Sequence, residues 1–131
     1  GPSYKFEQEL KNKILKKEFI KIIKNEENIA KLFAKHDLVI SSSGITAYEL
    51  SCLGIPSIFI PMDEYQAKTS SGLEKMGFGI DYGFWDDDFN KLEKIITKIS
   101  DYSVREKMFF SGRELVDGLG SNKILDEILI L

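Results

Sequence analysis

The sequence predicts an α/β fold: a Rossmann-like open parallel sheet with helices on both faces. Two patterns predict it. Short apolar runs rich in β-branched residues alternate with longer segments whose apolar residues recur at helical spacing. Strands of a parallel sheet that is covered on both faces have this continuous apolar character. The length of 131 residues, with 43% hydrophobic and 30% charged residues, indicates one domain over residues 1–131 with an ordinary core.

Four short apolar runs are the predicted strands. They are residues 19–23, 37–40, 57–60 and 78–81. The fourth run is the weakest of the four. Four strands are few for a sheet of this kind, and no strand precedes the first predicted helix. We therefore expect that one or more N-terminal strands of the sheet lie outside this chain.

Seven segments have helical spacing of their apolar residues. They are residues 5–17, 26–35, 46–53, 64–76, 88–99, 104–115 and 121–131. Terminal signals support several of them. Gly54 is placed to end the third helix, with Pro56 just after it, and Gly77 to end the fourth. Ser121 is the predicted N-cap of the last helix.

The composition excludes several classes of protein. A single cysteine, Cys52, excludes an internal disulfide framework and fits a reducing compartment. One cysteine and one histidine, His36, also argue against a zinc site. The net charge of −3 offers no basic excess for binding nucleic acid. No apolar run approaches the roughly 20 residues of a membrane span, and no secretory signal opens the chain, so a cytoplasmic location is expected.

The first residues bear on how complete the chain is. Gly1-Pro2-Ser3 stands where an initiator methionine is expected. The chain is therefore expected to be a piece of a longer protein, or else these three residues are an added remnant. In the first case it holds one part of a larger functional site.

The loop at residues 41–46 is the most informative candidate site. Ligands of an open parallel sheet bind at the carboxyl ends of its strands, where residues 23–25, 41–46 and 61–66 are expected to meet. The serine-rich loop opens a helix, whose first N–H groups favour an anion such as a diphosphate. It has neither the P-loop pattern nor the Gly-x-Gly-x-x-Gly fingerprint. A turn of this type without a ligand is an equal alternative.

Two side chains near these loops have two interpretations each. Glu49 follows Thr46 by three residues, so the pair fits a capping box in which Glu49 bonds to the helix start. Alternatively, its carboxylate accepts hydrogen bonds from two sugar hydroxyls. Gln66 is either a sugar-binding amide or a surface residue. Asp63 and Glu64 fit as acids at a helix N-terminus.

The remaining reactive residues favour structural roles. His36 is expected in a solvent-facing loop at the opposite end of the sheet, and Cys52 packs in a helix without a histidine partner nearby in sequence. Residues 86–88 are three aspartates, which fit a solvated turn with a helix N-cap better than a metal site. Trp85, with the aromatic residues beside it, forms either an exposed patch or a packed loop.

Three stretches of the sequence resemble the C-terminal half of GT-B nucleotide-sugar enzymes. They are residues 37–50 (DLVISSSGITAYEL), 54–57 (GIPS) and 64–66 (EYQ). Within these enzymes the sequence resembles two groups. One is the UDP-sugar hydrolases of pseudaminic-acid biosynthesis, with their spore-coat polysaccharide homologues. The other is the UDP-GlcNAc transferases that form lipid II. Residues 1–4 (GPSY) and 117–121 (DGLGS) are similar to the hydrolase group, so the resemblance spans nearly the whole chain.

The resemblance implies a set of substrate-binding residues. The backbone after the first predicted strand faces the uracil, the serine loop holds the diphosphate at the helix start, Glu49 binds the ribose, and Gln66 and Glu64 contact the sugar. The implied set is Ile23, Lys24, Asn25, Ser42, Ser43, Gly44, Ile45, Thr46, Glu49, Glu64 and Gln66. Ser43 and Tyr65 depart from the family pattern, where Gly and Asn are usual, which leaves the identity of the sugar open.

The resemblance also implies an activity. The chain is expected to be the donor-binding half of a UDP-sugar hydrolase of surface-polysaccharide biosynthesis or, alternatively, of a UDP-sugar glycosyltransferase. A non-catalytic α/β binding module is the alternative from another class. The hydrolases carry their catalytic histidine in the N-terminal domain, and no residue here matches it. The isolated domain should therefore bind a UDP-sugar, with no metal or cofactor, and need the missing N-terminal domain for turnover.

Overall fold

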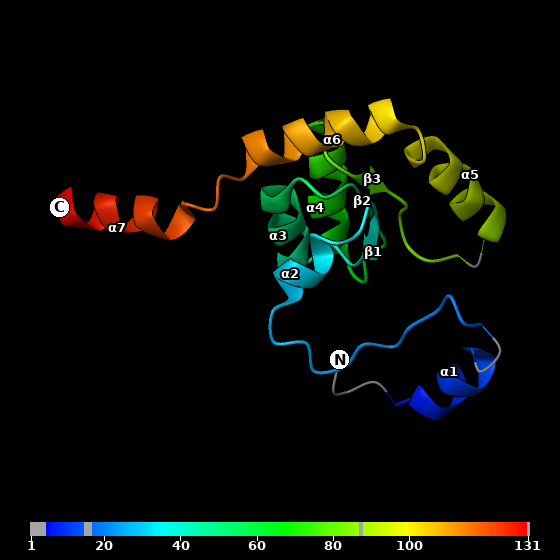
Figure 1. Cartoon of the computed structure of the whole chain (residues 1–131). Helices are drawn as coiled ribbons and strands as arrows, with labels where there is room; N and C mark the ends of the chain where they lie inside the picture. The colour runs from blue at the N-terminus through cyan, green and yellow to red at the C-terminus, as the bar shows by residue number, and fades with distance from the viewer. Residues whose placement is uncertain (1–4, 15–16, 87, 131) are drawn as a thin grey trace.

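The fold is α/β, built on a small parallel sheet with helices around it. A computed structural model describes residues 5–14, 17–86 and 88–130. The strands are β1 (Val39–Ser41), β2 (Ser57–Phe59) and β3 (Ile80–Asp81), in the order β1-β2-β3. Val39 of β1 lies opposite Ser57 of β2, and Ile58 of β2 lies opposite Ile80 of β3. The expected Rossmann-like class is confirmed (Figure 1).

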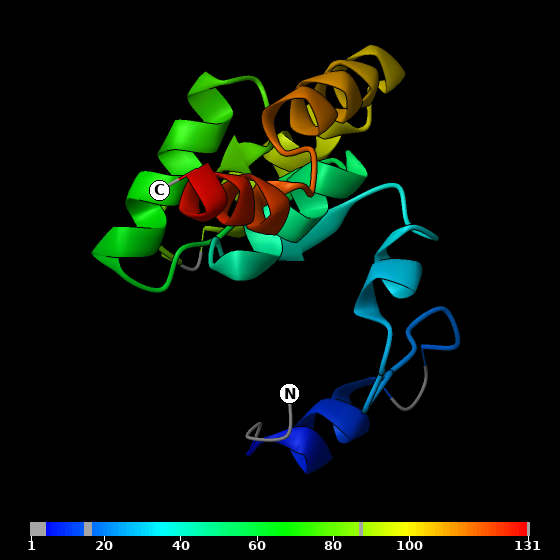
Figure 2. The ribbon, with the colours of Figure 1, turned by 90° about the vertical axis from the view of Figure 1, so that its left-hand side faces the viewer.

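Seven helices are present among the described residues. They are α1 (Glu7–Ile14), α2 (Ile29–Phe33), α3 (Ile45–Leu53), α4 (Glu64–Lys75), α5 (Phe89–Ile99), α6 (Tyr102–Leu115) and α7 (Gly120–Ile130). Helix α6 packs against α3, as the hydrogen bond from Ser51 to Gly112 shows. Helix α7 projects away from the rest of the molecule in Figure 1, and Figure 2 turns this side toward the viewer. No helix in the described ranges is both long and apolar enough to cross a membrane.

The core lies where β2 meets the helices. All three residues of β2 are buried, as expected for the central strand of a parallel sheet. Ala47 and Leu50 of α3 are also fully buried. Gly79 runs so close to the ring of Phe59 that a Cβ atom there would lie 2.4 Å from a ring carbon. A side chain at this position would push the chain before β3 away from the centre of the sheet.

The predicted strand at residues 19–23 is wrong. These residues form no strand, Phe19 is 84% exposed and Ile23 is 51% exposed. Residues 17–28 run with α1 on one side of the molecule, apart from the sheet (Figures 1 and 2). A strand is stabilised by hydrogen bonds to its neighbours, so an apolar β-branched run without a pairing partner remains irregular.

Several predicted helix boundaries also shift. The helix predicted at 26–35 is the shorter α2, because Asn28 caps it by accepting from the amide of Lys31. Helix α3 begins at Ile45 with Gly44 as N-cap, one residue before the predicted start. Helix α6 begins two residues early because Asp101 caps it. Helix α7 begins at Gly120, so Ser121 lies within the helix and is not its N-cap.

Other terminal signals are confirmed. Gly54 ends α3 with a left-handed φ of 69°, and Gly77 follows α4 with a φ of 86°. Asp88 caps α5, accepting from the amide of Lys91 at 3.0 Å. The predictions for residues 1–4, and for the parts of helices or loops at 15–16, 87 and 131, fall outside the described residues.

Candidate functional site

The loop after β1 brings the start of α3 to the surface at the carboxyl end of the sheet. Gly44 is the N-cap of α3 and contributes no side chain to the cap. The amides of Ile45 and Thr46 lie in the first turn, where an α-helix offers no intrahelical acceptor. Ile45 is 81% exposed. The positive end of the α3 dipole therefore faces outward, which is the arrangement that binds a phosphate group.

A buried hydroxyl joins this loop to the next one. Ser43 is 1% exposed, and its Oγ donates to the backbone carbonyl oxygen of Gln66 in α4 at 2.8 Å. The amide oxygen of the Gln66 side chain accepts from the backbone N–H of Met62 at 3.2 Å. Ser43 and Gln66 were both expected to touch the ligand. The Ser43 side chain is therefore used to hold the two loops together. The backbone of Ser43 and the side-chain amide nitrogen of Gln66 are the groups that can still contact a ligand.

Glu49 is a surface carboxylate without a partner among the described residues. It is exposed on α3, and no hydrogen bond or ion pair engages it. The capping-box interpretation is wrong, because Gly44 caps the helix and the Thr46–Glu49 pair lies within it. An unpaired acid one turn after a helix start is free to accept hydrogen bonds from a hydroxylated ligand.

Glu49 lines an open cavity of about 730 Å³. We call it the α3 cavity, and it lies between α2, α3 and the chain that joins α6 to α7. Its lining is mostly apolar and consists of Ile29, Ala30, Phe33, Ile45, Tyr48, Glu49, Cys52, Leu53, Leu115, Val116, Asp117, Gly118, Gly120 and Ser121. An apolar concave surface with a few polar groups is typical of a small-molecule site.

Part of the predicted set is not brought to this place. Ile23, Lys24 and Asn25 lie in the irregular segment before α2, apart from the start of α3 (Figures 1 and 2). Lys24 makes an ion pair with Glu7 of α1. Lys11 and Lys24 hydrogen-bond to Glu7 and lower the pKa of its carboxyl group to about 2. Asn25 has a left-handed φ of 52°.

Two further predicted residues, Ser42 and Glu64, keep positions compatible with a ligand. Ser42 is half-buried in the loop before α3, and Glu64 is exposed in the first turn of α4. Asp63 and Glu64 are acids at the helix N-terminus, as expected, and Asp63 is also the N-cap of α4, because its carboxylate accepts from the amide of Gln66 at 2.8 Å.

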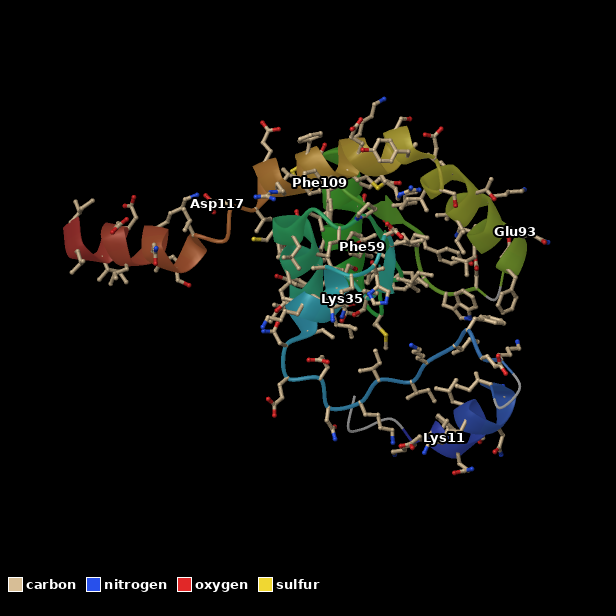
Figure 3. All side chains as sticks on the ribbon, viewed as in Figure 1. Lys11, Lys35, Phe59, Glu93, Phe109 and Asp117 are labelled. Atoms are coloured by element: carbon tan, nitrogen blue, oxygen red, sulfur yellow. The ribbon has the colours of Figure 1, made fainter. Side chains whose placement is uncertain are left out.

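Sequence reasoning missed the residues after α6 and the second face of α3. Figure 3 shows Asp117 in the connection between α6 and α7. Cys52 and Tyr48 line the α3 cavity although we expected Cys52 only to pack. The spacing of Ile45, Tyr48, Glu49 and Cys52, at i, i+3, i+4 and i+7, places them on one face of α3 and was a signal that could have found this face.

Other reactive side chains are occupied elsewhere. His36 is exposed in a loop as predicted, and its Nδ1 lies 2.8 Å from the carbonyl oxygen of Leu32. The hydroxyl of Tyr82 donates to Asp86 at 2.5 Å, which lowers the pKa of that carboxyl group. Trp85 stacks on Tyr82, with centroids 5.5 Å apart, and is 42% exposed. No group of three or more metal-ligating side chains is found within residues 5–14, 17–86 and 88–130.

Comparisons with known proteins place the chain in a family. Residues 1–109 match the family described as glycosyltransferase family 28 C-terminal domain. The spore coat polysaccharide biosynthesis protein SpsG of Bacillus subtilis (strain 168) is 28% identical over 122 residues, covering 92% of this chain and 36% of SpsG. An uncharacterized protein of Methanocaldococcus jannaschii is 41% identical over 69 residues, covering 50% of this chain and 14% of that protein. No solved structure matches the chain.

The match and the structure agree on the same part of the chain. The matched residues 1–109 include all three described strands and the starts of α3 and α4, where the exposed amides and the unpaired Glu49 lie. The chain spans about a third of the length of SpsG. From this match and the parallel α/β fold, we conclude that the chain belongs to the glycosyltransferase family 28 C-terminal domain family.

Proposed function

We propose that this chain binds the nucleotide part of a UDP-sugar, with the diphosphate at the start of α3 and the ribose at Glu49. One observation carries the proposal: the carboxylate of Glu49 has no partner in the described structure, and it lies one turn after helix amides that also lack an intrahelical acceptor. Both oxygens of a carboxylate accept hydrogen bonds, so Glu49 suits the ribose diol. The family match supports a nucleotide-sugar donor as the ligand class.

In the whole protein, the proposed role is donor binding by a UDP-sugar hydrolase or transferase of surface-polysaccharide biosynthesis. The name of SpsG supports the pathway. An oxygen nucleophile forms a bond to C1 of the sugar, and the bond from C1 to the β-phosphate oxygen breaks. The electron pair leaves on the UDP, and the α3 amides stabilise its negative charge. A base in another part of the protein takes the proton of the nucleophile.

Hydrolase and transferase differ in the nucleophile. Water attacks in the hydrolase, to which our first interpretation assigns the chain, and an acceptor hydroxyl attacks in the transferase. The family description supports the transferase as a second candidate. Incubating the whole protein with UDP-sugars and no acceptor separates them. Release of free sugar together with UDP favours the hydrolase, whereas UDP release that depends on an added acceptor favours the transferase.

Titration calorimetry with UDP tests the binding site. Glu49→Gln keeps the size of the side chain and removes its charge. We expect the Kd for UDP to rise roughly 10- to 100-fold, because hydrogen bonds to a charged group contribute about 1.5–3 kcal/mol. Glu93→Gln is the matched control, since Glu93 lies on α5, and Figure 3 shows it across the sheet from Asp117.

Each result of this titration has a defined meaning. If UDP binds the unmodified chain and only Glu49→Gln weakens it, the proposal is supported. If the unmodified chain does not bind UDP, the non-catalytic module becomes the better interpretation. Binding that is equal in both variants and the unmodified chain places the nucleotide away from Glu49.

A further inference from the structure

We propose that the linker between α6 and α7, residues 116–119, forms the outer wall of the nucleoside subsite. The ribose and base of bound UDP then lie in the α3 cavity, between α2, Glu49 of α3 and this linker. The inference rests on the function proposed above. The linker lies beyond residues 1–109, so the family match assigns nothing to it.

The charges around the α3 cavity suit the neutral part of a nucleotide. Glu49 and Asp117 are the only charged side chains among its described lining residues, and no lysine or arginine lines it. Asp117 is already engaged, since its carboxylate lies 2.6 Å from Nζ of Lys123, and Lys123 lowers its pKa. Glu49 is thus the carboxylate in this described lining that has no partner. A diphosphate would meet no cation here, whereas sugar hydroxyls would meet a carboxylate and apolar walls.

The cavity also continues directly from the proposed phosphate site. Ile45, whose amide is in the first turn of α3, lines the end of the cavity nearest the helix start. Cys52 lines it seven residues later, about 10 Å along the helix axis at 1.5 Å per residue. A nucleotide with its phosphates at the helix start therefore extends along this face of α3, with the linker on its other side.

The linker is held against α3 at one close contact. Gly118 has a left-handed φ of 76°, and a Cβ atom there would lie 3.1 Å from Sγ of Cys52. The Asp117 carboxylate accepts from the amide of Leu119 at 2.9 Å, in addition to its ion pair with Lys123. The close approach at Gly118 sets the distance between the linker and α3. The two Asp117 contacts hold the linker to the start of α7.

Gly118→Ala tests the wall, measured by titration calorimetry with UDP on the purified chain. The added methyl group strains the backbone and pushes the linker from Cys52, so we expect the Kd for UDP to rise about tenfold. Gly83→Ala is the matched control. Gly83 also has a left-handed φ, of 81°, but it lies outside the cavity and its Cβ would meet nothing closer than 4.0 Å. We expect UDP binding to Gly83→Ala to be unchanged.

Alkylation of Cys52 gives a second measurement that needs no variant. Cys52 is the only cysteine of the chain, so iodoacetamide labelling followed by mass spectrometry reports on this one thiol. We expect saturating UDP to slow the labelling severalfold, because the nucleoside covers the thiol. This measurement still tests the inference if Gly118→Ala does not fold.

The outcomes separate this inference from the proposed function. The linker is supported as a wall if UDP binds more weakly to Gly118→Ala and equally well to Gly83→Ala, and if UDP slows the labelling of Cys52. The inference is overturned if Glu49→Gln weakens UDP binding while Gly118→Ala binds UDP as the unmodified chain does and UDP leaves the labelling rate of Cys52 unchanged. In that case the proposed function stands. No binding of UDP to the unmodified chain overturns both.

Discussion

The hydroxyl of Ser51 in α3 donates a 3.0 Å hydrogen bond to the backbone carbonyl oxygen of Gly112 in α6. These positions are 61 residues apart, and the bond joins α3 to α6. A Cβ atom on Gly112 would lie 2.6 Å from the ring of Phe78 and 2.8 Å from the carbonyl oxygen of Ser51. The absence of a side chain at Gly112 therefore allows α6 to pack over α3.

Gly112→Ala should lower the free energy of unfolding by about 1–3 kcal/mol, because the methyl group overpacks this contact. Urea denaturation followed by circular dichroism measures the change. Gly72→Ala in α4 is the control, since a Cβ there meets nothing within 4 Å and alanine favours a helix over glycine by about 1 kcal/mol. Equal midpoints for the two variants would contradict the close contact.

Ser43→Ala should lower the free energy of unfolding by about 1 kcal/mol. The substitution removes a buried donor to the carbonyl oxygen of Gln66, which keeps its second donor, the hydroxyl of Ser70. Thermal and urea unfolding check the value. Ser121→Ala, at an exposed position of α7, should stay within about 0.5 kcal/mol of the unmodified chain. If Ser43→Ala loses no more unfolding free energy than Ser121→Ala does, the stability of the loop does not depend on the hydrogen bond from Ser43.

Tyr82→Phe should raise the pKa of Asp86. The Tyr82 hydroxyl is the main cause of the lowered pKa of that carboxyl group, with a further contribution from the backbone amide of Asp88. A carboxyl group whose pKa is lowered in the folded state stabilises the fold above its unfolded pKa, and this stabilisation is lost as the pH falls through the folded pKa. The stability difference between Tyr82→Phe and the unmodified chain should therefore shrink in acid.

Carboxyl NMR titration of Asp86 provides the direct measurement. Phe89→Leu changes an exposed aromatic residue of the same region and leaves the hydroxyl in place, so it should not move the Asp86 pKa. An Asp86 pKa that is the same in Tyr82→Phe and in the unmodified chain would exclude the hydrogen bond in solution.

Lys11→Ala and Lys24→Ala should each raise the pKa of Glu7 from about 2. Lys11 is the larger cause, so its removal should produce the larger rise. The same NMR titration, applied to Glu7, ranks the two variants. If Lys24→Ala leaves the Glu7 pKa unchanged, the ion pair that joins α1 to the segment before α2 is not formed in solution.

The part of the fold from β1 to β3 could be predicted because its signals are local. Gly54 and Gly77 take the left-handed conformations that end α3 and α4, and each lies where the sequence placed a helix end. The apolar runs on either side of α3 form adjacent parallel strands. In this region the local preferences and the tertiary packing agree, so sequence patterns were sufficient.

The failures have physical causes that no local pattern contains. Residues 19–23 have strand propensity but no neighbouring strand to pair with. The spacing of Thr46 and Glu49 fits a cap, yet the backbone of the preceding loop makes Gly44 the N-cap and frees the acid. The contact of Gly118 with Cys52 joins positions far apart in the sequence, so the wall of the α3 cavity depends on how α6 crosses α3.

Strand β1 also has a consequence for handling the protein. Within the described residues it pairs with β2 on one side only, and Ile40 on it is 47% exposed. The main-chain groups along its other side are open to any extended chain that comes near. Two molecules can pair through exposed strands of this kind, so at high concentration the tendency of this protein to aggregate should depend on whether another chain covers the strand at Ile40.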